Sequence, residues 1–290
     1  MTSAPARAGP FCRFQRLRRV DVGEARETIL KAFLLAGGHG TRLRPITDSV
    51  PKCLVPIRGK PLLDIWLDRC ADSGITDVLI NLHAHAPAIE RHLRRRDSPV
   101  KVCVIREDRL LGSAGTIAAN RAWIGSDAAF WILYCDVLTN TNLERMAEFH
   151  LRHGQVATLG LYQVPDPARC GIAITDPTGL IVDFEEKPVN PRSNWAFTGL
   201  MVAQSQLFKW IPERIPADIG FDLLPRLVGK MQGYPIHDYL LDIGTVPNYQ
   251  KAQMTWATDL GDTGTESGKQ EKHRLCRDKV HDNVHAGESI

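Results

Sequence analysis

The chain has 290 residues, 43% of them hydrophobic and 24% charged, and its formal net charge is +3. This composition predicts a globular protein, long enough for one large α/β domain or two smaller ones. The mild charge gives no reason to expect a nucleic-acid partner, and the apolar runs are too short to span a membrane.

The two ends of the chain differ in composition from the part between them. Residues 1–28 are rich in arginine and lack the apolar core of a secretory signal, so we interpret them as a flexible extension, with a transit peptide as the alternative. Residues 259–290 are polar and rich in glycine, which predicts a disordered tail. The seven cysteines include no CxxC pair and favour free thiols in a reducing cytoplasm.

The first part of the domain, residues 29–154, alternates apolar strands with helices. Strands are predicted at 29–36, 76–82, 100–105 and 129–136. Helices are predicted from Pro61 to Gly74 with Leu62, Trp66 and Cys70 on one face, over a segment ending at Arg96, and over 114–124. This order predicts an α/β fold with a Rossmann-like, mostly parallel sheet sandwiched by helices, which binds ligands at the carboxyl ends of its strands.

The second part, residues 155–258, has a different pattern. A helix over 143–153 precedes it, with Thr141 and Glu144 as a predicted capping box and Gly154 as its end. Strands are predicted at 156–164, 171–175 and 180–187, and the DPTG segment at 176–179 predicts a hairpin turn between the last two. This half is expected to be a mixed sheet with fewer helices.

The segment AGGHGTRLRP, from Ala36 to Pro45, carries the strongest local signal. It follows a strand, and its glycines allow backbone N–H groups to approach an anion closely. It is not a Walker A loop, because no Gly-Lys-Ser/Thr follows, and Leu43 occupies the third glycine position of a dinucleotide fingerprint. A triphosphate cradle with positive charge from Arg42 is the remaining interpretation. Lys52 lies a short loop away, in PKCLVPIRGKP.

The compound pattern GGxGTRLxP followed by PKxxxPIxGKP resembles the sugar nucleotidyltransferases, from about Lys31 to Gln253. The resemblance implies a GT-A-like fold, Mg²⁺, and partners that are a nucleoside triphosphate and a sugar 1-phosphate. The overall pattern is most similar to mannose-1-phosphate guanylyltransferases, which favours GTP and mannose 1-phosphate. Heptose-1-phosphate guanylyltransferases and thymidylyl, uridylyl or cytidylyl enzymes for glucose 1-phosphate stay open, as do a non-catalytic nucleotide-sugar-binding subunit and a homo-oligomer.

The resemblance also implies roles for individual residues. Asp136 and Asp242 each follow or end a predicted strand, and the resemblance places the metal-binding aspartates there; Mg²⁺ typically takes one or two carboxylates plus phosphates. Arg42, Lys52 and Lys187 are the expected catalytic residues. The acceptor side is expected to comprise Gly171, Glu186, Lys187, Thr198 and Gly199. The nucleotide is expected to contact Leu35, Ala36, Gly37, Gly38, Gly40, Thr41, Arg42, Lys52 and the base-binding turn at Gly112, Ser113 and Gly115.

Two histidine pairs could suggest zinc, His83 with His85 and His150 with His153. Neither has a third ligand nearby in the sequence. We interpret His153 as a cation stabilised by the end of its helix, and His83 and His85 as loop residues near the nucleotide.

Overall fold

The computed structural model describes residues 29–125 and 129–257. The described residues up to Thr255 belong to one compact unit. The predicted N-terminal extension and C-terminal tail lie outside the described residues. Within the described ranges, no helix is long and apolar enough to cross a bilayer.

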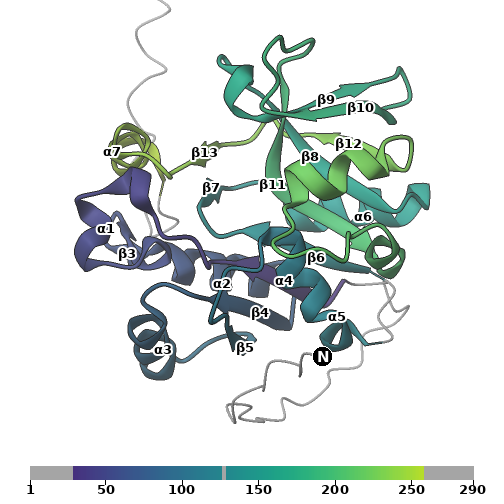
Figure 1. Ribbon diagram of the computed structural model, residues 1–290. Coiled ribbons are helices and arrows are strands. Elements are labelled where there is room, and N and C mark those ends of the chain that lie inside the picture. The colour runs from purple at the N-terminus through teal and green to yellow at the C-terminus, as the bar shows by residue number, and fades with distance from the viewer. Residues whose placement is uncertain (1–28, 126–128, 258–290) are drawn as a thin grey trace, which may run out of the picture. The chain divides into compact units, whose positions relative to one another are not determined.

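A large central sheet confirms the predicted α/β fold. Its parallel part runs in the order β6 (Ala129–Tyr134), β1 (Lys31–Leu35), β4 (Asp77–Leu82) and β5 (Lys101–Arg106). Figure 1 shows β4 and β5 at one end of the sheet and the β9–β10 pair at the other. Because these four strands are parallel, their carboxyl ends meet at one edge, where the site described below lies.

The remaining strands form the mixed part of the sheet. β11 (Trp195–Gln204) is antiparallel to β6 and also pairs with β8 (Ala157–Gln163) and β9 (Gly171–Thr175). β10 (Ile181–Glu186) pairs with β9 across the predicted DPTG turn, and β12 (Met231–Pro235) pairs with β8. Two small ladders lie outside this sheet, β2 (Pro56–Ile57) with β3 (Lys60–Pro61), and β7 (Val137–Thr139) with β13 (Leu240–Asp242).

Both faces of the parallel strands are covered. Phe33 and Leu79 pack in one hydrophobic cluster with Ile117 from the α4 helix (Ser113–Ala119). The alternate residues Leu34 and Ile80 point to the opposite face and are also fully buried. Burial on both faces explains why these strands are continuous apolar runs rather than alternating ones.

The helices differ from the predictions in detail. α2 (Leu62–Asp72) begins after Pro61, which is its N-cap rather than its first residue, and ends before Gly74 at φ 75°. The helix predicted over 114–124 is two helices, α4 and α5 (Arg121–Ile124), because Asn120 interrupts it and its side chain binds Thr116 O. α3 spans Ala86–Arg95, one residue short of Arg96. The remaining helices are α1 (Ile46–Ser49) and α7 (Val246–Thr255). The short helical turns are η1 (Thr41–Leu43), η2 (Lys52–Leu54), η3 (Pro167–Arg169), η4 (Ser205–Lys209), η5 (Ile219–Leu223) and η6 (Leu224–Leu227).

The predicted capping box of α6 (Leu143–His153) was wrong. The N-cap is Asn142, whose Oδ1 accepts a hydrogen bond of 2.9 Å from Arg145 N. The Thr141 hydroxyl instead lies 2.8 Å from that of Thr139, in a buried contact with β7. The helix ends as predicted, at Gly154 in the left-handed conformation.

Candidate active site

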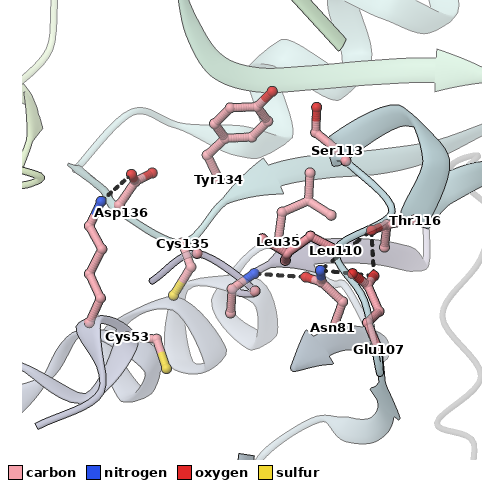
Figure 2. A pocket seen from close by; sticks show the side chains of 15 residues that line it. Leu35, Cys53, Asn81, Glu107, Leu110, Ser113, Thr116, Tyr134, Cys135 and Asp136 are labelled. Carbon is pink, nitrogen blue, oxygen red and sulfur yellow. Dashed lines mark hydrogen bonds and ion pairs between the residues drawn. The ribbon is translucent and has the colours of Figure 1, made fainter. Parts of the chain in front are cut away.

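A cavity of about 270 Å³ lies at the carboxyl ends of the parallel strands. The glycine loop after β1, the end of β4, the segment after β5 and the turn after β6 all contribute to its walls. Figure 2 shows Asn81, Glu107 and Thr116 gathered on one side of this pocket and Asp136 on the other. The strand-end residues that a parallel sheet brings together therefore enclose one space.

The glycine loop is held tightly at two glycines. A Cβ atom at Gly37 would lie 2.6 Å from Asn81 Nδ2, and Gly40 has φ 69° with Lys52 Cβ 3.1 Å from its Cβ position. Gly38 has open space around it. Leu35, Ala36, Gly37, Gly38 and Lys52 line the pocket, whereas Thr41 and Arg42 begin the exposed η1 turn. Glycine is thus required at 37 and 40 for close packing and backbone conformation.

A buried polar network forms one wall of the pocket. Asn81 Oδ1 accepts from Ala36 N at 2.9 Å, and Asn81 Nδ2 donates to Glu107 Oε1 at 3.1 Å. Thr116 Oγ1 donates to the same Glu107 oxygen, and Leu111 N donates to Glu107 Oε2 at 3.3 Å. These residues were not predicted from the sequence. Asn81, a polar residue inside an apolar strand, and Glu107, directly after the third strand, were the available signals.

The opposite wall brings the two predicted aspartates together. β7 and β13 pair so that Asp242 faces Val137, and Ile243 N donates to Asp136 O at 3.0 Å. Lys52 Nζ lies 2.6 Å from Asp136 Oδ2, and Arg42 Nη2 lies 3.9 Å from Asp242 Oδ2. The two carboxylates and two cations therefore form one cluster.

Gly244 marks the point on which this cluster converges. A Cβ atom there would lie 2.8 Å from Asp242 Oδ1, 2.9 Å from Arg42 Nη2 and 3.1 Å from Lys52 Nζ. The Asp242 side chain keeps 51% of its surface exposed, but protein surrounds much of the carboxyl group. This partial burial, and then the negative charge of Asp136, raise the pKa of the Asp242 carboxyl.

This donor set fits Mg²⁺. Burial is the larger cause of the raised pKa of Asp242, and the negative charge of Asp136 adds to it; a divalent cation relieves such repulsion between carboxylates. The described residues contain no group of three or more His, Cys, Asp and Glu side chains that could hold a metal. Two hard carboxylates without further side-chain ligands match an ion that takes its other ligands from phosphates and water.

The predicted base-binding turn is bound to a distant segment. The amides of Ala114 and Gly115 donate to Ala217 O at 3.0 and 3.1 Å, and Gly112, at φ 78°, lies against the same carbonyl. Ser113 Oγ lies 2.9 Å from Asp218 Oδ2 and accepts from Ile219 N at 2.7 Å. Gly112 and Ser113 line the pocket, and the Gly115 amide is already used within the protein.

Three of the residues predicted for the acceptor side, Gly171, Glu186 and Lys187, lie together at the end of β10. Glu186 is held between two glycines, since Cβ atoms at Gly171 and Gly220 would lie 2.4 and 2.3 Å from its Oε2. Burial raises the pKa of the Glu186 carboxyl, against the opposing effect of Lys187. Lys187 has a strained φ of 53°, and its ammonium lies 3.8 Å from Glu186 Oε1. Gly220 was not predicted from the sequence.

Thr198 and Gly199 lie at an irregularity in β11. The β11–β8 register shifts between Phe197 and Met201. Within this shift, Thr198 Oγ1 donates to Gly160 O at 2.9 Å, and Gly199, at φ 81°, packs on the Tyr134 side chain. Both residues are buried, so in this structure Thr198 anchors the strand.

Cys170 lies within electrostatic reach of both Glu186, on the predicted acceptor side, and Asp242, in the aspartate cluster. Cys170, whose carbonyl accepts from Lys187 N at 2.9 Å, is half-buried beside both groups. Burial raises the pKa of the Cys170 thiol, and the charges of Glu186 and Asp242 add to the effect. Cys170 is therefore the residue through which the predicted acceptor side and the predicted metal side are related in this structure.

The histidines have mainly structural roles. Burial lowers the pKa of His153, which contradicts the interpretation of this residue as a cation. His150 and His153 share the Thr158 hydroxyl at 2.9 and 2.7 Å, between α6 and β8. His83 Nδ1 donates to Glu107 O at 2.8 Å, so this residue does lie beside the pocket wall.

The comparisons with known proteins agree with this geometry. A family model described as nucleotidyl transferase matches residues 31–259. A mannose-1-phosphate guanyltransferase from Schizosaccharomyces pombe is 30% identical over 80% of this chain and 65% of its own length. A UTP–glucose-1-phosphate uridylyltransferase from Synechocystis is 31% identical over 77% of this chain and 62% of its own length. The chain thus spans a little under two thirds of these two relatives.

A solved structure covers the fold more completely. HddC from Yersinia pseudotuberculosis, complexed with GMP-PN, superposes with a TM-score of 0.66 at 25% identity, over 78% of this chain and 99% of its own. The family model matches most of the described residues, and the structure contains the strand-end cluster that the motifs predict. The chain therefore belongs to the nucleotidyl transferase family.

Proposed function

We propose that this protein transfers a nucleoside monophosphate from a nucleoside triphosphate to a sugar 1-phosphate and releases pyrophosphate. The observation that carries the proposal is the convergence of Asp136, Asp242, Lys52 and Arg42 beside the glycine loop. Glu186 and Lys187 form a second charged pair, and Cys170 lies within electrostatic reach of both groups. Such a site can hold two phosphorylated molecules at once.

The mechanism is in-line attack by an oxygen of the sugar 1-phosphate on the α-phosphorus. A phosphate monoester is itself a nucleophile, so the protein supplies position and charge. Orienting the two reactants contributes about 7–11 kcal/mol in well-aligned systems. Lys52 and Arg42 offset the charge that develops on the phosphates, and Lys187 holds the attacking phosphate. Mg²⁺ on Asp136 and Asp242 would add Lewis-acid neutralisation of the triphosphate.

GTP and mannose 1-phosphate are the favoured substrates. The name of the fission-yeast relative and the GMP-PN complex of the Yersinia protein support this choice. The pocket wall is compatible with it, because Glu107 lines the pocket and its Oε2, which accepts one hydrogen bond from Leu111 N, has a lone pair for a second. Guanine presents N–H donors on its Watson–Crick edge. The uridylyltransferase relative keeps other bases and glucose 1-phosphate as the alternative.

The test is a panel assay of nucleoside triphosphates against sugar 1-phosphates with Mg²⁺, measured by pyrophosphate release. We expect the highest kcat/KM with GTP and mannose 1-phosphate. Asp136→Asn and Asp242→Asn should each lower kcat at least about 100-fold, because a metal ligand and a charge partner are lost. Asp238→Asn, an exposed aspartate outside the cluster, is the matched control and should retain wild-type kcat.

Two results would contradict the proposal. Near-normal turnover in both aspartate variants would exclude their metal role. Binding of a nucleotide sugar without pyrophosphate release, for every substrate pair, would instead support a non-catalytic binding subunit.

A further inference from the structure

Phe221 is an exposed aromatic residue at the acceptor side with no role in the function proposed above. It lies in η5, and 57% of its surface is accessible. The Lys187 ammonium lies over its ring, 5.3 Å from the centroid, which is within cation–π range.

The backbone that carries the ring is held by its neighbours. Phe221 N donates to Asp218 Oδ1 at 3.1 Å, and the Asp218 carboxylate also contacts Ser113. The preceding residue, Gly220, packs against the Glu186 carboxylate. The backbone segment that carries the ring is therefore attached to the two elements that carry the predicted acceptor residues and the predicted nucleotide turn.

The position of the Lys187 ammonium depends on contacts with neighbouring side chains. Its side chain is 56% exposed, so solvent alone would leave the ammonium free to sample many rotamers. Its backbone is constrained by the left-handed φ and by the hydrogen bond to Cys170 O. Glu186 Oε1, at 3.8 Å, attracts the ammonium from one side, and the Phe221 ring contacts it from another.

We propose that Phe221 is a positioning residue that holds the Lys187 ammonium ready for the phosphate of the sugar 1-phosphate. The inference rests on the role proposed for Lys187. Its basis is electrostatic: the negative face of an aromatic ring attracts a cation, whereas an aliphatic side chain of similar size does not.

The variants separate charge attraction from bulk. Phe221→Leu keeps an apolar side chain but removes the ring, and Phe221→Trp keeps a ring. In Phe221→Leu we expect KM for mannose 1-phosphate to rise roughly two- to fivefold, the range for an exposed cation–π contact, with KM for GTP unchanged. Phe221→Trp should keep the wild-type KM. Trp210→Leu removes a second such contact, with Lys230 at 4.8 Å, outside the site, and should leave both KM values unchanged.

A readout without turnover keeps the two proposals distinguishable. Competitive acetylation with acetic anhydride, followed by mass spectrometry, measures the reactivity of each lysine in the substrate-free protein. Phe221→Leu should raise labelling of Lys187 but not of Lys230, and Trp210→Leu should do the reverse. Unchanged Lys187 labelling in Phe221→Leu, or a KM that falls or does not change, overturns the inference. If the wild type shows no turnover with any pair, the proposed function fails and the labelling alone decides the role of Phe221.

Discussion

Replacing Gly220 by alanine should disable the acceptor side without unfolding the protein. The new Cβ atom would lie 2.3 Å from Glu186 Oε2 and 2.7 Å from its Cδ, whereas ordinary contact begins near 3.4 Å. The carboxylate must therefore move by about 1 Å. A hydrogen bond of typical length that lengthens this much exceeds the usual limit and is lost.

The magnitude follows from the bond that is lost. A hydrogen bond to a charged group contributes about 1.5–3 kcal/mol, which corresponds to roughly 10- to 150-fold in kcat/KM for the sugar 1-phosphate. The assay is pyrophosphate release at saturating GTP with mannose 1-phosphate varied. The midpoint of urea unfolding should stay close to that of the wild type, because the displaced atoms are the far end of a flexible side chain.

A double-mutant cycle tests the reasoning directly. If alanine at 220 acts only through Glu186, it should cause no further loss in a Glu186→Ala background, since the displaced group is absent. Wild-type kcat/KM in Gly220→Ala would refute the argument. So would a full additional loss in the Glu186→Ala background, because the alanine would then act on something else.

Two further predictions concern stability. Gly199→Ala should lower the unfolding free energy by about 2–4 kcal/mol, because its Cβ would lie 2.8 Å from Tyr134 Cβ at a φ of 81°; a urea titration showing a loss under about 1 kcal/mol would contradict this. Burial lowers the pKa of His150 from 6.5 to about 4, so the unfolded chain binds a proton that the folded one does not. The contribution of His150 to the unfolding free energy is thus fully present above pH 6.5. The unfolding free energy should fall by about 3 kcal/mol as the pH drops towards 4. Urea titrations at several pH values should show this decrease in unfolding free energy for the wild type but not for His150→Gln. Parallel pH profiles of the two proteins would contradict the prediction.

The parallel half of the fold was predictable because its signals are local. A strand buried on both faces is an unbroken apolar run, and such a run needs no knowledge of its neighbours to be recognised. The glycine loop was likewise visible, since the strand before it and the arginine within it are adjacent in the chain. The positions of helix ends were harder. Thr141 and Asn142 are both good capping residues, and the choice fell to Asn142 because β7 supplies a partner for Thr141.

A site residue could be predicted only where it belongs to a local sequence pattern that is recognisable by itself. Asp136 and Asp242 follow recognisable strands, so their meeting could be expected from the resemblance. No sequence motif identifies Gly220, because the residue that requires a glycine there, Glu186, approaches it from a strand that is distant in the sequence. The same holds for Asn81 and Glu107, which become partners only when β4 and β5 lie side by side.

The segment from Ala217 to Phe221 explains how two separate recognition tasks can share one site. Its first carbonyl binds the amides of the predicted nucleotide turn, and its last residues contact Glu186 and Lys187. A shift of the turn on nucleotide binding would therefore move the groups that face the acceptor sugar, and a shift of the acceptor residues would move the turn. The linkage consists of backbone hydrogen bonds of 3.0 and 3.1 Å at one end and a close glycine contact at the other, so a displacement at one end is transmitted to the other.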